Sequence, residues 1–97
     1  MMCGGHSNLK TPDAEDHEEF NSWKPAVEAA CGETYATFEV VGYTSQVVAG
    51  TNFQLKIHVG DQKYVHAKVF RPLPHTGNPA SVSNHKTGCT LDDGFAW

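Results

Sequence analysis

The chain has 97 residues, of which 39% are hydrophobic, and its formal net charge is −4. A chain of this length forms one small domain with a modest core, and we expect that domain to span residues 1–97. Negative charge without a basic patch or a basic amphipathic helix excludes nucleic acid and an anionic membrane surface from the expected partners. No apolar run is long enough for a membrane span or a signal-peptide core, so we expect a cytoplasmic protein, with the nucleus left open.

Residues 1–10 are expected to form a flexible N-terminal arm, because Gly4 and Gly5 are followed by polar residues that cannot build a core. A helix start is predicted at Thr11, an N-cap residue followed by proline at the first helical position. The acidic residues of 13–19 come next, where the helix dipole favours negative charge.

This helix is predicted to bury one face, on which apolar residues recur at helical spacing. The members of that face are Phe20, Trp23, Val27 and Ala30 or Cys31. Pro25 interrupts the pattern. Because proline removes a backbone donor and crowds the preceding turn, we expect a kinked or locally loosened helix there. Gly32 is the predicted end of the helix.

Three strands are expected, at about 38–45, 51–59 and 63–71, with a turn at 60–62. The second and third alternate apolar and polar residues, so each presents one apolar face to the helix. These faces comprise Phe53, Leu55, Ile57 and Val59, then Val65, Ala67 and Val69. A thinner fourth strand is expected after the loop at 77–79, where Ala80 and Val82 alternate with polar residues. The chain is therefore predicted to be an α+β domain, with one helix in the concavity of a four- to five-stranded antiparallel sheet.

The stretch Gln46-Val47-Val48-Ala49-Gly50 places apolar side chains between two expected strands. Such a connection runs over the surface and normally carries Gly, Asn, Asp or Ser. Two adjacent valines would leave apolar area in water, and Gly50 would permit tight backbone geometry, which predicts a contact site for another macromolecule. The alternative is that Val47 and Val48 belong to the strands and that the turn lies elsewhere.

The segment 46–53 resembles the first inhibitory hairpin of the cystatins, and specifically of their single-domain intracellular branch, the stefins. The order of other motifs agrees with this resemblance over almost the whole chain. Residues 1–5 resemble the glycine-bearing stefin N-terminus, residues 63–70 resemble the third strand, and Leu73-Pro74 resembles the second hairpin loop. The resemblance implies a cystatin fold, although Ala80 and Val82 are smaller than the family pattern and His85 stands where a tyrosine is usual.

The resemblance also implies tight, reversible, competitive inhibition of papain-like cysteine proteases. The expected targets are of the cathepsin L, S, H and B type, either lysosomal enzymes that leak into the cytosol or those of a pathogen. The N-terminal arm and two hairpin loops would fill the active-site cleft. The residues expected to contact the protease are Met2, Cys3, Gly4, Gly5, Gln46, Val47, Val48, Ala49, Gly50, Leu73, Pro74 and His75. No catalytic residue, metal or cofactor is expected.

Each segment has a distinct expected role in that contact. Gly5 and Gly50 would let backbone approach the protease walls closely, and the valines would supply the desolvated contacts. Pro74 would stiffen the second loop, so that less entropy is lost on docking. His75 would touch the rim of the cleft and make affinity mildly dependent on pH.

The chain has three cysteines, Cys3, Cys31 and Cys89, which cannot all pair and match no disulfide framework or zinc motif. This pattern fits a reducing compartment. Cys31 is expected to be a small buried hydrophobe, and no role is assigned to Cys89. A monomer is expected, while a dimer linked through exposed Cys3 under oxidising conditions, or a domain-swapped dimer, stays open.

An enzyme and a metal-binding module are the two alternative classes of function. An enzyme could pair a thiol with one of the six histidines, but no local signature surrounds any cysteine. A non-inhibitory cystatin-fold module could hold a weak zinc or copper ion between His58 and His66, which the alternation places on the outer face of adjacent strands. No third ligand is nearby in sequence, so a solvated outer face is the simpler expectation.

Overall fold

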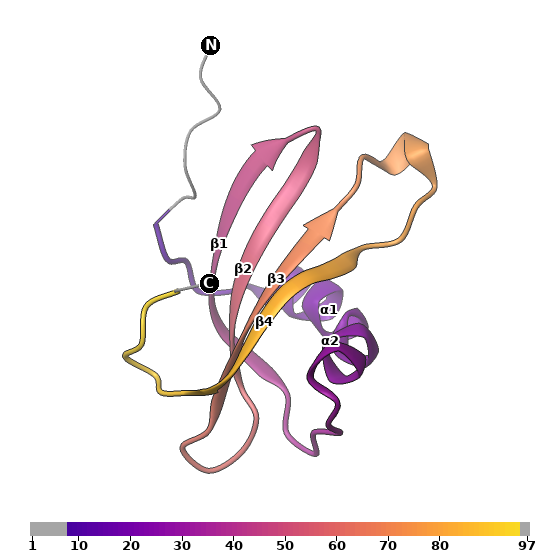
Figure 1. Cartoon of the computed structure of the whole chain (residues 1–97). Helices are drawn as coiled ribbons and strands as arrows, with labels where there is room; N and C mark the ends of the chain where they lie inside the picture. The colour runs from indigo at the N-terminus through magenta and orange to yellow at the C-terminus, as the bar shows by residue number, and fades with distance from the viewer. Residues whose placement is uncertain (1–7, 96–97) are drawn as a thin grey trace.

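The computed structural model describes residues 8–95, which form a helix-covered antiparallel sheet. In chain order the elements are α1 (Ala14–Ser22), α2 (Lys24–Cys31), β1 (Glu39–Val48), β2 (Gly50–His58), β3 (Tyr64–Arg71), the 3-10 helix η1 (Pro74–Thr76) and β4 (Ser81–Cys89). The sheet has the order β1-β2-β3-β4, and every neighbouring pair is antiparallel (Figure 1). The predicted α+β class and sheet are confirmed. Within 8–95, no helix has the length and apolar character needed to cross a membrane.

The helix begins two residues later than predicted, because Asp13 rather than Thr11 is the N-cap. The Asp13 carboxylate accepts a hydrogen bond from the Asp16 backbone N–H at 2.8 Å, and Asp16 accepts one from the Asp13 N–H at 3.1 Å. This reciprocal capping box satisfies two donors that would otherwise lack a helical partner. With Thr11 as the N-cap, the third helical residue would be Ala14, which has no side-chain acceptor to complete such a box.

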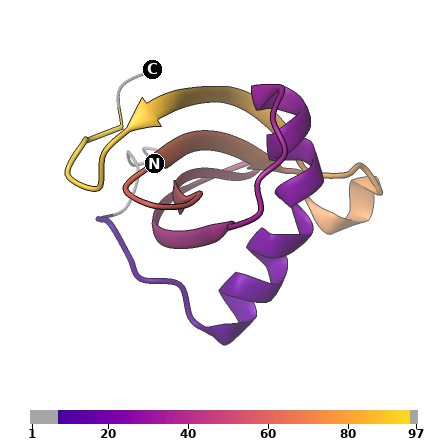
Figure 2. The same ribbon diagram turned by 90° about the horizontal axis from the view of Figure 1, so that it is seen from below.

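The predicted irregularity near Pro25 is confirmed: the helix is interrupted there and forms two separate helices, α1 and α2. Trp23 separates α1 from α2 with φ −90° and ψ −3°, and Pro25 lies in the first turn of α2. A proline there costs little, since the first helical N–H groups have no intrahelical acceptor. Gly32 ends α2 with φ 71°, as predicted. Both helices lie against one face of the curved sheet, which Figure 2 shows from below.

The core forms between the helices and the concave face of the sheet, as the alternation predicted. Its buried members are Phe20, Trp23, Val27, Val40, Phe53, Leu55, Ile57, Ala67 and Val69. The Phe20 ring lies edge-on to Tyr43 and Phe53, with centroids 5.1 Å and 5.7 Å away. Burial of each Val, Leu, Ile or Phe side chain of this core stabilises the fold by about 1.5–3 kcal/mol. Cys31 is partly buried against this core, and Cys89 is buried with its Sγ close to the Lys86 and Thr87 carbonyls.

The first hairpin is tighter than predicted. Val48 pairs with Gly50 in the register of β1 and β2, so Ala49 alone lies outside the strands. The backbone of Val47 and Val48 therefore belongs to β1, as the alternative interpretation stated. The expected loop at 46–50 is wrong because ladder hydrogen bonds continue almost to the tip.

The fourth strand, β4, extends further than its weak alternation indicated. It does so because it pairs with the edge of β3, from Phe70 to Tyr64, with two register shifts.

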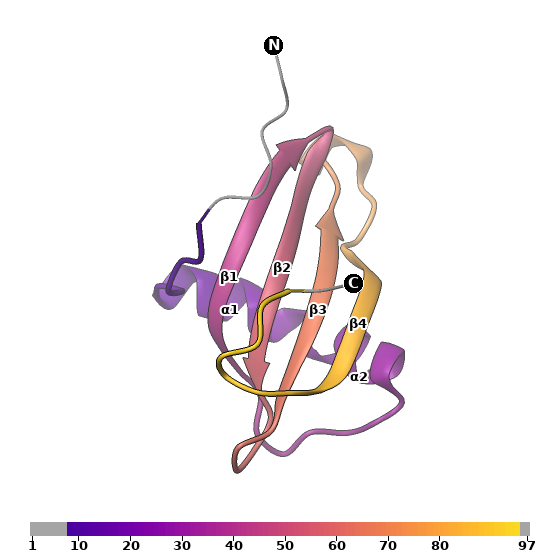
Figure 3. The same ribbon diagram turned by 60° about the vertical axis from the view of Figure 1, so that its left-hand side comes forward.

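Residues 90–95 fold back across part of the outer face of the sheet, at the end away from the two hairpin tips (Figure 3). The Lys56 Nζ donates to the Leu91 carbonyl at 2.6 Å, and the Phe95 ring lies 4.7 Å from the His66 ring. The prediction of a solvated outer face is therefore wrong for His66, which is 1% exposed. The register also places His66 opposite Lys56 rather than His58. Among the described residues, no three His, Cys, Asp or Glu side chains lie close enough together to hold a metal ion.

Burial of His66 predicts a dependence of stability on pH. Burial lowers the pKa of this imidazole, the positive charges of Lys56 and Lys86 lower it further, and Asp93 opposes them. A folded-state pKa below the unfolded value of about 6.5 means that the unfolded chain binds the proton more readily. The stabilisation is thus complete above about pH 6.5 and is lost as the pH falls below it, by at most about 1.4 kcal/mol per pH unit.

This dependence is measured by urea unfolding between pH 7.5 and pH 5. We expect His66→Phe, which keeps a ring against Phe95, to flatten the decline in the free energy of unfolding. His85→Gln is the matched control, because His85 is exposed on β4. An equal decline in the parent and in His66→Phe would contradict the assignment to His66.

Candidate functional site

Two hairpin tips lie at the same end of the sheet. The first tip comprises residues 46–50, which are the end of β1, Ala49 and the first residue of β2, and the second tip comprises residues 72–79 between β3 and β4. In an antiparallel meander the first and third connections leave from one end, and the second connection leaves from the other. Figure 1 shows both tips at the upper end of the sheet and the turn between β2 and β3 at the lower end. The two loops that the resemblance implies would fill one cleft therefore lie at the same end of the sheet.

Both tips expose apolar side chains and carry no charge. Val47 is 73% exposed and Leu73 is 39% exposed, while Val48 is half-buried beside the exposed Ala49. Neither 40–55 nor 72–85 contains Asp, Glu, Lys or Arg. His75 is exposed in the second tip, and Gln46 is half-buried opposite Asn52. Such a surface is suited to an apolar, concave partner, because no charge must be desolvated on contact.

Gly50 has an internal role that the sequence did not indicate. It is buried, with φ +123°, and a Cβ at this position would lie 2.7 Å from the Arg71 carbonyl oxygen and 2.8 Å from Phe70 Cζ. The close approach that Gly50 permits is therefore to β3 of its own chain. Gly50 thereby lets the first tip contact the strand that leads into the second tip.

Hydrogen bonds hold the second tip in a compact turn. The Leu73 carbonyl accepts hydrogen bonds from the Thr76 N–H at 3.1 Å and from the Thr76 hydroxyl at 2.8 Å. The same hydroxyl accepts one from the Asn78 N–H at 3.3 Å. Pro74 begins the short helix η1 that these bonds close. The turn thus presents Leu73 at the end of the sheet without a long loop.

The predicted N-terminal contact residues lie outside the described part of the chain. They are Met2, Cys3, Gly4 and Gly5. The described end of the expected arm is not free: Lys10 exchanges two backbone hydrogen bonds with Tyr43, at 2.8 Å and 2.9 Å. The Leu9 side chain also packs over Gly42. The expected boundary of the arm at residue 10 is therefore wrong, because Leu9 and Lys10 are joined to the open edge of β1.

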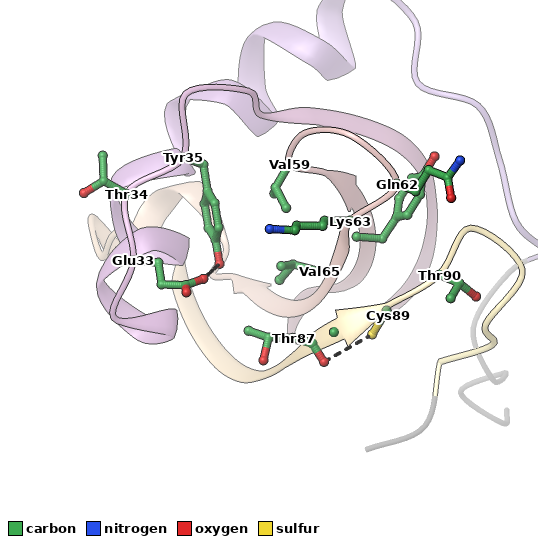
Figure 4. Close-up of a pocket in the computed structure, with 12 residues that line it drawn as sticks. Glu33, Thr34, Tyr35, Val59, Gln62, Lys63, Val65, Thr87, Cys89 and Thr90 are labelled. Carbon is green, nitrogen blue, oxygen red and sulfur yellow. Dashed lines mark hydrogen bonds between the residues drawn. The ribbon is translucent and has the colours of Figure 1, made fainter.

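A hollow of about 770 Å³ lies at the opposite end of the sheet from the tips (Figure 4). The Tyr35 ring and the Lys63 side chain extend into it, and Val59 and Val65 form part of its wall. The Tyr35 hydroxyl donates to the Glu33 carboxylate at 3.0 Å, and burial raises the pKa of Tyr35 well above its usual range. Glu28 accepts from the Tyr35 N–H at 2.7 Å, which fixes the segment between α2 and β1. This hollow contains none of the predicted contact residues.

The fold and the tips define a small α+β binding domain, and comparison with known proteins identifies its family. Residues 6–90 match the family model of the cystatin domain. The chain is 41% identical to leukocyte cysteine proteinase inhibitor 1 of Sus scrofa over 93 residues, which cover 96% of this chain and 90% of that protein. It is 41% identical to cystatin-A1 of Sus scrofa, with the same coverage, and 39% identical to human cystatin-B, with 96% and 95% covered. The chain belongs to the cystatin family, which confirms the resemblance found in its sequence.

Proposed function

We propose that this protein is a reversible, tight-binding, competitive inhibitor of papain-like cysteine proteases. The observation that carries the proposal is the pair of uncharged tips at one end of the sheet, with Val47 and Leu73 exposed. One relative is named a cysteine proteinase inhibitor, and others are named cystatins. The contact surface consists of the first tip, the second tip through Leu73, Pro74 and His75, and the segment that contains Met2, Cys3, Gly4 and Gly5.

The proposed mechanism is occlusion of the catalytic groove without covalent chemistry. The first tip is a strand pair with Ala49 as its only residue outside the ladder, so the hairpin is preorganised and little entropy is lost on docking. Each valine that becomes buried in the complex contributes about 1.5–3 kcal/mol. A hairpin held in this shape crosses the groove without presenting a peptide bond to the protease thiolate. Substrate is excluded because the two compete for the same groove.

The proposal assigns no enzymatic step and no metal to this chain. Of the described cysteines, Cys31 is partly buried and Cys89 is buried, and burial raises the pKa of Cys31. A thiol with a raised pKa is a poor nucleophile. The proposed targets are of the cathepsin L, S, H and B type. The proposed compartment is the cytoplasm, with the nucleus left open, since three cysteines without a disulfide pattern fit a reducing environment.

Titration of papain tests the proposal directly. Residual activity on a small peptide substrate is measured against inhibitor concentration, at several substrate concentrations. We expect activity to fall to near zero, with an apparent inhibition constant that rises with substrate, and the chain to be recovered intact from the complex after denaturation. Unchanged papain activity at micromolar concentrations of the chain would overturn the proposal, and recovery of a cleaved chain or of a covalent adduct would overturn the non-covalent mechanism.

Removal of residues 1–5 tests the contribution of the N-terminal segment. We expect the inhibition constant for papain to rise about tenfold, which corresponds to a loss of about 1.4 kcal/mol of binding free energy. The thermal midpoint should not change, because the described anchoring of this end begins at Leu9 and Lys10. The control replaces residues 1–5 with an equal length of Gly and Ser. Inhibition equal to that of the parent by both variants would remove this segment from the contact surface.

A further inference from the structure

Arg71 occupies the point at which the two tips and α1 meet. It is the last residue of β3, and Pro72 and Leu73 of the second tip follow it directly. Its carbonyl oxygen is the atom nearest to the position that a Cβ of Gly50 would take. It pairs with Thr51 in the register of β2 and β3. The backbone of this one residue thus adjoins the first tip on one side and continues into the second tip on the other.

The Arg71 side chain is held by α1 and by the core of the first hairpin. Its Nη1 donates to both carboxylate oxygens of Glu19, at 2.6 Å and 2.7 Å. Its guanidinium lies 4.9 Å from the centroid of the Phe53 ring. The carboxylate and the aromatic ring both restrain the position of the guanidinium. The helix therefore constrains the strand end from which the second tip departs.

The Glu19–Arg71 ion pair lies outside the buried core. The side chains of Arg71 and Glu19 are 42% and 37% exposed, and ion pairs at such exposure contribute little to global stability. In the described chain they form the one ion pair between a carboxylate and a cationic side chain. The two residues are 52 positions apart in sequence. Because Arg71 adjoins both tips, the ion pair is suited to set the relative position of the tips.

We infer that Glu19 and Arg71 are positioning residues that hold the two apolar tips in the mutual geometry needed to enter one groove. The inference rests on the proposed function for the meaning of that geometry. Neither side chain needs to touch the protease. Loss of the pair would leave the fold intact but let the second tip move relative to the first, so a protease would have to select the competent arrangement from several.

The test compares Glu19→Gln, Arg71→Met and the double variant with the parent. Glu18→Gln is the matched control, because Glu18 is exposed and is the neighbour of Glu19 in sequence. This substitution removes the same charge as Glu19→Gln. We expect Glu19→Gln and Arg71→Met each to raise the inhibition constant for papain about fivefold, and the double variant to be no worse than either. Thermal midpoints of Glu19→Gln and Glu18→Gln should agree, and Glu18→Gln should inhibit like the parent.

A second readout follows the tips themselves and needs no protease. Residual dipolar couplings of the Val47 and Leu73 amides report the relative orientation of the tips, and we expect them to change in Glu19→Gln but not in Glu18→Gln. Unchanged couplings in Glu19→Gln would overturn the inference. So would additive losses in the double variant. Weaker inhibition by Arg71→Met together with unchanged inhibition by Glu19→Gln would also overturn it, since that result would indicate direct contact of Arg71 with the protease. If the parent itself fails to inhibit papain, the proposed function fails while the couplings still decide the positioning role.

Discussion

Val47→Asp is expected to raise the inhibition constant for papain about 100-fold and to leave the fold intact. The Val47 side chain is 73% exposed at the end of β1, so the folded monomer gains a solvated carboxylate at little cost. In the proposed complex the same carboxylate would enter an apolar groove. The variant would lose the valine burial of about 1.5–3 kcal/mol and would add the cost of desolvating a charge without a partner. A loss of about 2.7 kcal/mol already corresponds to 100-fold.

The measurement is the same titration of papain, with thermal unfolding as the check on the fold. Leu91→Asp is the matched control, because Leu91 is also apolar and 51% exposed but lies in the segment that covers part of the outer face. Its carbonyl still accepts from Lys56, since that hydrogen bond uses only backbone. The control should inhibit like the parent. Equal inhibition by Val47→Asp and the parent would remove the first tip from the contact surface.

The first tip is the part of the site that the sequence predicted best. Two adjacent valines without charged neighbours are a local pattern, and the structure leaves Val47 exposed as that pattern indicated. The same holds for the core, where period-two alternation in β2 and β3 correctly identified Leu55, Ile57, Ala67 and Val69 as inward-facing. These predictions succeed because the alternation within a strand decides which of its side chains face the helices.

The missed features depend on contacts between segments that are far apart in sequence. Glu19 and Arg71 are ordinary surface residue types, and nothing in either local sequence indicates that they meet. Burial of His66 depends on the return of residues 90–95 across the sheet, and these residues carry no strand or helix pattern. The N-cap at Asp13 is a different case. Two plausible capping residues lie two positions apart, and the reciprocal bond with Asp16 decides between them.

Gly50→Ala is expected to weaken inhibition about 30-fold by separating the two tips. An alanine Cβ would lie 2.7 Å from the Arg71 carbonyl, a separation that non-bonded atoms do not tolerate, and backbone atoms cannot turn aside as a flexible side chain could. The backbone would also be strained, because φ +123° is a conformation that only glycine adopts readily. The first tip must therefore move away from Phe70 and Arg71. The Val47 and Leu73 side chains would then no longer fit one groove together.

Gly60→Ala separates the effect of the contact from the effect of backbone strain. Gly60 has φ +121°, nearly the value of Gly50, but nothing lies within 4 Å of the position of its Cβ, and it is in the turn at the opposite end of the sheet. Both variants should lose about 1–3 kcal/mol of stability from backbone strain. Only Gly50→Ala should lose inhibition, because only there does the added methyl group meet the strand that carries the second tip. If Gly60→Ala weakened papain inhibition as much as Gly50→Ala does, general destabilisation rather than the relative position of the tips would control binding.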